Sequence, residues 1–267
     1  MMKIIFMTGS HPRHLYIARL LFEAGMLGGL IVEQRSNFLP APSPHLSDRD
    51  RANFIRHFHD RQTAEHTMFG QIDLACFGDL PLLQVSPTEL NGEETKRWLV
   101  DHPADMAVSY GIHKLDNEVL DLLPEHAWNI HGGLSPWYRG SITLFWPFYF
   151  LKPNWAGMTI HRLSAKIDAG DIIHHSVPVL ERGDGIHDVA CKAVKQAAED
   201  LVAIARLMET GRSVEAVPQK SSGKLFTTAD WTPQHLRLIY NTFDNDIVDR
   251  YLDGEFERTE PSLIRAL

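Results

Sequence analysis

Three polar side chains are placed where they could together carry out acyl transfer: the amide of Asn129, the imidazole of His131 and the carboxylate of Asp168. Asn129 and His131 are two residues apart at the end of a strand-like segment, so their side chains face the same side. Asp168 lies in a tight turn that could bring its carboxylate to the imidazole. Such a set can stabilise an oxyanion and move a proton without a covalent nucleophile. Turn capping by the same residues is the alternative.

The turn after the first predicted strand lacks a dinucleotide-binding motif. That motif needs Gly-x-Gly-x-x-Gly, whereas residues 9–14 read Gly-Ser-His-Pro-Arg-His. Pro12 also has no N–H to donate to a phosphate. We therefore expect no NAD-dependent oxidoreductase. Gly9, Ser10 and Arg13, at the start of a helix, could still hold one anionic group of a substrate, and a plain βα turn is the alternative.

Hydrolase and metal motifs are also incomplete. A nucleophile elbow needs Gly-x-Ser-x-Gly, but the segment around Ser135 has Trp137 in the position of the last glycine. Among the 15 histidines, His11 and His14 have the best spacing for a metal, yet no cysteine or carboxylate nearby completes a site. We therefore expect neither a serine hydrolase nor a metal site.

The composition is that of an ordinary globular protein, either an enzyme or a binding domain. The chain has 267 residues, and its 34 acidic and 26 basic residues give a formal net charge of −8, which disfavours nucleic acid as a partner. The two cysteines form no framework, and no apolar run is long enough to span a membrane. We expect a cytoplasmic protein. Trp146, Phe148 and Tyr149 could form the contact surface of a homodimer, although burial would explain them equally.

The apolar pattern predicts strands that alternate with helices, and therefore an α/β fold. This order indicates a Rossmann-like, mainly parallel twisted sheet with helices on both faces. Ligands bind beyond the carboxyl ends of such strands, so loops 9–14, 110–114 and 131–139 should converge. The predicted strands are 3–8, 27–33, 104–110, 127–131, 156–163 and 171–179, and the predicted helices are 13–24, 48–62, 93–101, 116–123, 141–151 and 185–210.

The last part of the chain is predicted to be a small appendage. We expect residues 1–211 to form the catalytic domain and residues 212–267 to form a small C-terminal subdomain. Within that subdomain, the pattern indicates a short strand over 224–227 and a helix over 232–251.

Two linked segments carry a resemblance to a known family. Residues 128–140 read Trp-Asn-Ile-His-Gly-Gly-Leu-Ser-Pro-Trp-Tyr-Arg-Gly, and 157–162 and 166–173 follow in the expected order and spacing. This sequence resembles the signature of the folate-dependent formyltransferases, which include glycinamide ribonucleotide, methionyl-tRNA and sugar-nucleotide N-formyltransferases. The resemblance covers 104–179 best. It implies the formyltransferase fold.

The resemblance also implies the chemistry. The formyl group would come from 10-formyltetrahydrofolate as co-substrate, no metal would be needed, and Asn129, His131 and Asp168 would be the catalytic trio. The residues that the resemblance places at the folate are Ser109, Tyr110, Gly111, Ile112, His113, Ile167 and Ala169.

The acceptor is the part that the resemblance defines least. The Gly132-Gly133 pair and Trp137 depart from the usual family loop, and the whole loop looks closest to the sugar-modifying members. The acidic charge and the short tail also speak against a tRNA. The resemblance thus implies that the acceptor is a primary amine, on an amino sugar of a nucleotide-linked sugar. Another amine, such as an amino acid, glycinamide ribonucleotide or methionyl-tRNA, and a non-catalytic folate-binding protein are the alternatives. The expected substrate contacts are Gly9, Ser10, Tyr138 and Arg139.

Overall fold

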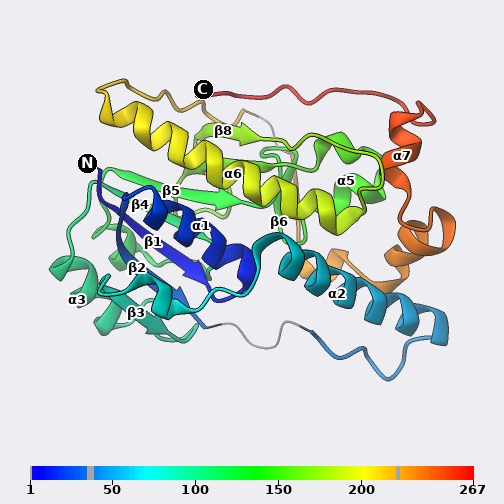
Figure 1. Ribbon diagram of the computed structural model, residues 1–267, viewed down its shortest axis with the longest axis horizontal. Coiled ribbons are helices and arrows are strands. Elements are labelled where there is room, and N and C mark those ends of the chain that lie inside the picture. The colour runs from blue at the N-terminus through cyan, green and yellow to red at the C-terminus, as the bar shows by residue number, and fades with distance from the viewer. Residues whose placement is uncertain (1, 35–38, 221–222) are drawn as a thin grey trace.

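The computed structural model describes residues 2–34, 39–220 and 223–267, and it is built around one twisted sheet (Figure 1). The strand order is β3-β2-β1-β4-β5-β7-β8. The strands from β3 to β5 are parallel, β7 is antiparallel to β5, and β8 is antiparallel to β7. The strands are β1 (Ile4–Gly9), β2 (Leu27–Glu33), β3 (Leu82–Val85), β4 (Met106–Tyr110), β5 (His126–His131), β7 (Met158–Arg162) and β8 (Ile172–Ser176). The predicted mainly parallel α/β fold is confirmed.

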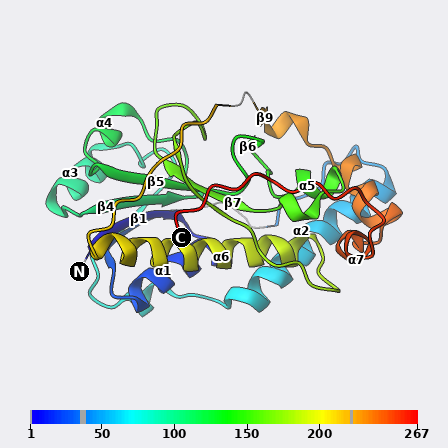
Figure 2. The ribbon, with the colours of Figure 1, turned by 90° about the horizontal axis from the view of Figure 1, so that it is seen from above.

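Helices cover both faces of this sheet (Figure 2). On one face α1 (Pro12–Glu23) packs against α6 (Ile186–Glu209), and α2 (Asp48–Phe69) contacts both of them. On the other face lie α3 (Glu93–Asp101) and α4 (Asn117–Leu120). The central strands are almost wholly apolar and buried, as expected for parallel strands covered on both sides.

Several predicted elements differ from the structure. Strand β3 and the short strand β6 (Tyr138–Gly140) were not expected, and α2 is longer than predicted because it ends only at Gly70. The predicted helix over 141–151 shrinks to α5 (Trp146–Tyr149), since Ile142 and Leu151 have positive φ angles of 58° and 55°. Such angles are incompatible with a right-handed helix.

The predicted helix over 232–251 is also wrong. Asp244 and Asn245 have φ angles of 45° and 65°, which break the helix in its second half. Only α7 (Ile247–Leu252) is a regular α-helix there. Within the tail, 3-10 helices lie at Thr228–Asp230 and Pro233–His235, and a π-helical turn spans Leu238–Thr242. Two further 3-10 helices lie earlier in the chain, at Leu74–Phe77 and Pro153–Trp155.

The tail packs closely onto the rest of the chain. Its short strand β9 (Lys224–Phe226) pairs in parallel with β6, and Val217 forms a bridge with Ile172 of β8. Its buried apolar residues share one cluster with Trp146 and Phe148, which are therefore buried within the chain. In the described ranges no helix is long and apolar enough to cross a bilayer.

Candidate functional site

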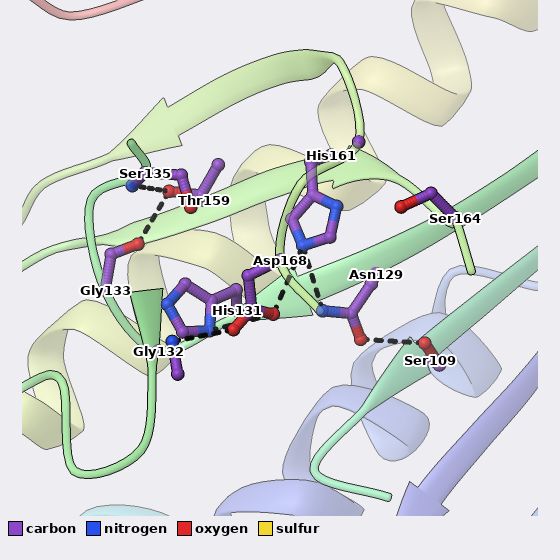
Figure 3. A network of polar contacts seen from close by, with 12 residues as sticks. Ser109, Asn129, His131, Gly132, Gly133, Ser135, Thr159, His161, Ser164 and Asp168 are labelled. Carbon is purple, nitrogen blue, oxygen red and sulfur yellow. Dashed lines mark hydrogen bonds and ion pairs between the residues drawn. The ribbon is translucent and has the colours of Figure 1, made fainter. Parts of the chain in front are cut away.

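The loops that begin at the carboxyl ends of β1, β4 and β5 meet at one edge of the sheet. Gly9 and Gly111 both lie against the ring of His14, so the first two of these loops touch. Asn129 and His131 occupy the end of β5, and Asp168 lies in the link from β7 to β8. Figure 3 shows that these three side chains come together. His131 Nδ1 is 3.4 Å from Asp168 Oδ1.

The Asn129 amide is oriented by a chain of hydrogen bonds (Figure 3). Ser109 Oγ donates to Asn129 Oδ1 at 2.8 Å, which turns the NH₂ group toward His161 Nε2 at 3.2 Å. His161 Nδ1 donates to the Arg162 carbonyl at 2.8 Å, so Nε2 is the acceptor for Asn129. One Asn129 N–H remains to donate to a ligand.

His161 is a site residue that the sequence reasoning missed. Its Nε2 atom lies 3.7 Å from Asp168 Oδ1, and its side chain is almost fully buried. Strand pairing explains its position, because Asn129 of β5 is directly opposite His161 of β7. The signal was present: the segment 157–162 belongs to the second half of the quoted signature.

His131 is buried and held at both ring nitrogens. Nε2 donates to the Tyr138 carbonyl at 2.8 Å, and Nδ1 faces Asp168. Burial lowers the pKa of His131, while the Asp168 charge and the Tyr138 carbonyl oppose this. Because a carbonyl can only accept, a proton on Nδ1 as well would form an ion pair with Asp168.

Asp168 is kept ionised by its surroundings. Burial would raise its pKa, but the His131 charge, His161 and the Gly140 N–H lower the pKa of Asp168 to about 2. The Gly140 N–H donates to Asp168 Oδ2 at 2.8 Å. Asp168 has a positive φ of 46°, a backbone conformation that non-glycine residues rarely adopt and that often marks a functional position.

A residue of the tail forms hydrogen bonds with the turn that carries Asp168. Gln219 Nε2 donates to the carbonyls of Asp168 at 3.0 Å and Gly170 at 2.6 Å, so one amide fixes the catalytic turn. Gly140, whose N–H reaches Asp168, has a φ of 93°, and a Cβ there would lie 2.1 Å from the Phe226 carbonyl of β9. Only glycine therefore fits between the two strands at this point.

Two cavities reach the edge of the sheet where the trio lies. The smaller cavity, about 90 Å³, is lined by Asn129, Asp168 and the loops around 109–115 and 163–168. The larger cavity, about 350 Å³, lies between α1, α2 and α6 and reaches Gly111 and Gly132, the latter next to His131 in the chain. Asn129 and Asp168 thus face the smaller cavity, whereas the larger cavity comes near the trio at Gly132.

The residues expected at the folate are divided between these cavities. Ser109, Ile112, His113 and Ile167 line the smaller cavity, whereas Tyr110 and Gly111 line the larger one. Ala169 is not among the residues that line either cavity in the described part of the chain.

The loop that lines the smaller cavity is fastened by Glu33, a fully buried carboxylate at the end of β2. It accepts from the His113 backbone N–H at 2.8 Å and lies 2.8 Å from His113 Nδ1. The sequence analysis did not single out Glu33, because its contact with His113 is non-local.

The expected substrate contacts Gly9, Ser10, Tyr138 and Arg139 are not among the described residues that line the larger cavity. Gly9 packs against His14, and neither Gly9 nor Ser10 is among the residues that line the larger cavity. Tyr138 is buried against Phe226, and Arg139 donates to the Gly223 carbonyl at 3.1 Å. Their role in substrate binding stays a prediction. The described ranges contain no group of three or more His, Cys, Asp or Glu side chains suited to a metal ion.

Comparison with known proteins identifies the family. A family model described as formyl transferase matches residues 59–205, which is more than half of the chain. The chain belongs to the formyl transferase family.

Solved structures share the fold. Phosphoribosylglycinamide formyltransferase from Anaplasma phagocytophilum is 17% identical, with a TM-score of 0.56 over 85% of this chain and 98% of that chain. A sugar N-formyltransferase from Shewanella sp FDAARGOS_354 is 16% identical, with a TM-score of 0.54 over 89% and 87%. The formyltransferase PseJ from Anoxybacillus kamchatkensis is 17% identical, with a TM-score of 0.50 over 91% and 95%.

Proposed function

We propose that this protein transfers a formyl group from 10-formyltetrahydrofolate to the primary amine of a small acceptor, an amino sugar of a nucleotide-linked sugar. The observation that carries the proposal is the convergence of Asn129, His131 and Asp168 beside a cavity that Asn129 and Asp168 line, with a second cavity that reaches Gly132, next to His131 in the chain. A reaction between two bound molecules needs two binding spaces that open on one set of polar groups.

Similar proteins support the choice of both substrates. The PseJ structure contains UDP-4,6-dideoxy-4-formamido-L-AltNAc and tetrahydrofolate. The structure of an N-formyltransferase from Helicobacter canadensis contains folinic acid and dTDP-3-aminofucose. We assign the folate to the smaller cavity, where Ser109, Ile112, His113 and Ile167 offer polar and apolar contacts to a flat heterocycle. The larger cavity is left for the acceptor.

Each member of the trio has a role in this proposal. The acceptor amine attacks the formyl carbon of the bound folate, and the bond from this carbon to the folate nitrogen then breaks. The freed nitrogen takes up a proton, and tetrahydrofolate leaves. Asn129 stabilises, through its remaining N–H, the negative charge that develops on the formyl oxygen. His131, whose Nε2 is held by the Tyr138 carbonyl, assists as the imidazolium that forms when Nδ1 takes up a proton beside Asp168. Asp168 orients His131 and receives the proton that the amine loses, directly or through water. His161 fixes the direction of the Asn129 amide.

The test is an amine-dependent deformylation assay. The protein is incubated with 10-formyltetrahydrofolate and a panel that contains nucleotide-linked amino sugars, glycinamide ribonucleotide and amino acids. Release of tetrahydrofolate is followed by absorbance, and the product by the mass of one added CO. Turnover with an amino sugar supports the proposal. Turnover with another amine alone would show that the proposed acceptor is wrong. Binding of folate without turnover of any amine would indicate a non-catalytic protein.

A further inference from the structure

The β5–β6 loop, residues 132–137, connects His131 to the carbonyl that holds its ring. That carbonyl belongs to Tyr138, directly after the loop, and it accepts from His131 Nε2 at 2.8 Å. Thr159 of β7 fixes the loop from one side (Figure 3). Its hydroxyl accepts from the Ser135 N–H at 2.8 Å and donates to the Gly133 carbonyl at 2.6 Å. The orientation of His131 therefore depends on how firmly this loop is held.

His175 of β8 is a second side chain that holds the β5–β6 loop. Its Nε2 atom lies 2.8 Å from the Ser135 carbonyl, and its Nδ1 atom accepts from the Ile264 backbone N–H at 3.0 Å. Because a backbone N–H can only donate, the ring proton is on Nε2 and is donated to Ser135. Burial lowers the pKa of His175 to about 4, so the ring is neutral and both hydrogen bonds exist at pH 7. One buried ring thus joins the loop to the tail.

The tail segment, residues 264–266, pairs with the edge of the sheet at His175. The His175 N–H donates to the Ile264 carbonyl at 2.8 Å, which adds a backbone hydrogen bond to the one that reaches the ring. Arg265 Nη1 donates to the His175 carbonyl at 2.6 Å. The backbone and the ring of His175 are therefore both bound to this segment.

His174, the preceding residue of β8, binds the same segment from the opposite face of the strand. Its Nδ1 atom accepts from the Ala266 N–H at 3.0 Å, and its Nε2 atom lies 3.1 Å from Asp200 Oδ2 of α6. Successive side chains of a strand point to opposite faces. His174 therefore connects the tail segment to α6, whereas His175 connects it to the β5–β6 loop.

We infer that His175 is a positioning residue for the reaction: through Ser135 it holds the β5–β6 loop, and so keeps the Tyr138 carbonyl on His131 Nε2. The other nitrogen of His131 then stays directed at Asp168. A ring that turned freely would have the geometry for proton transfer only part of the time. The effect of this contact on the rate rests on the proposed formyl transfer, whereas its effect on the His131 ring does not.

The first test observes the His131 ring in the full chain, without folate and without an acceptor. The protein is labelled with ¹⁵N-histidine, and the two ring signals of His131 are assigned by their loss in His131→Gln. Their chemical shifts show which nitrogen carries the proton. His175→Phe keeps a ring next to the loop but removes both of its hydrogen bonds, so the His131 signals should shift or broaden. His175→Gln retains a donor for the Ser135 carbonyl and should stay closer to wild type.

The matched control is His174→Phe. It also removes two hydrogen bonds from the tail segment and its surroundings, while Asp200 keeps its bonds with Ser176 and Gln196. Urea unfolding should show that it is destabilised at least as much as His175→Phe, yet its His131 signals should be those of wild type. Unchanged His131 signals in His175→Phe, or equal changes in the two variants, overturn the inference.

A pair of backbone variants keeps the test decisive if His175→Phe does not fold. Ile264→Pro removes the N–H that His175 accepts, and Ala266→Pro removes the N–H that His174 accepts. The His131 signals should move in Ile264→Pro and stay in place in Ala266→Pro. The same response in both variants would show that the tail segment does not act through His175.

A second measurement uses an amine that the wild-type protein formylates. In His175→Phe kcat should fall about tenfold while both KM values stay within about twofold, because proton transfer is disturbed and the substrate contacts are not. His174→Phe should keep the wild-type kcat, and an equal loss in both variants overturns the inference. His131 signals that respond to His175 alone, in a protein that formylates no amine, contradict only the proposed function.

Discussion

The two cavities near the trio are built in different ways. The smaller cavity is lined by residues from short loops, at 109–115 and 163–168, that lie in or near the signature. The larger cavity is lined mainly by helices α1, α2 and α6, which are far apart in the chain and mostly outside the signature. This difference suggests that the reaction chemistry is specified locally, while acceptor choice depends on how distant helices pack.

The first prediction concerns Asp168, which lines the smaller cavity and faces His131. Asp168→Asn keeps the shape of the side chain but removes the carboxylate that faces His131 and holds the Gly140 N–H. Proton transfer by a positioned group contributes about 100- to 10,000-fold, so kcat should fall by that factor. This fall in kcat is measured from steady-state rates with an amine that the wild-type protein formylates.

The control for Asp168→Asn is Asp171→Asn, three residues further along the same link, which should remain within about threefold of wild type, as surface changes usually do. Folding of both variants is checked by circular dichroism. If Asp168→Asn kept more than about a tenth of the activity, the assigned role would be wrong.

The second prediction concerns acid stability and the larger cavity. Native His57 has its pKa lowered to about 3 by burial, whereas the unfolded chain takes up this proton near pH 6.5. The unfolded state therefore binds more protons below pH 6.5, and the stability contributed by neutral His57 is lost as the pH falls. Between pH 7.5 and 5 this amounts to about 2 kcal/mol, or about 30-fold in the unfolding constant.

Urea unfolding from pH 7.5 to 5 measures this dependence. In His57→Gln the stability should fall less steeply by about 1.4 kcal/mol per pH unit, because the titrating group is gone. His59→Gln, with an exposed ring on the same helix, is the matched control and should keep the wild-type slope. Equal slopes in the two variants would show that His57 is not the group that is protonated.

The contrast between the cavities also explains what the sequence could and could not predict. The central strands and Asn129 and His131 were predicted because their periodicity and their two-residue spacing are local properties. Asp168 was predicted from its tight turn, which is also a local property, and the family resemblance pointed to the same residue. His161 was missed because its place beside Asn129 depends on the antiparallel pairing of β5 with β7.

The tail shows the same limit. Its predicted helix fails where Asp244 and Asn245 adopt positive φ angles, and its contacts with Asp168 and β6 arise from tertiary packing. No local pattern encodes a contact such as that of Gln219 with Asp168, 51 residues away in the sequence. The division at residue 211 stays a prediction.

The third prediction concerns Gln219, the tail residue that fixes the catalytic turn. Gln219→Met keeps the length of the side chain but removes both hydrogen bonds to the carbonyls of Asp168 and Gly170. Two neutral hydrogen bonds, each contributing about 1 kcal/mol, hold the turn. Without them the Asp168 carboxylate should be less well positioned, which should lower kcat about tenfold with little change in either KM. Gln219→Asn should restore none of this loss, because its amide is one methylene too short. A rise of both KM values at constant kcat would show that the tail only supports binding.

The smallest effect should fall on the smaller cavity alone. Glu33→Gln keeps the buried shape but replaces charge-assisted bonds to His113 with neutral ones, a difference of about 1 kcal/mol. The part of the 109–115 loop that follows Gly111 lines only the smaller cavity. The KM for the folate should therefore rise about fivefold, and the KM for the acceptor should not change. If Glu33→Gln raised the acceptor KM as much as the folate KM, the two cavities would act as one site, and the assignment of one substrate to each would fail.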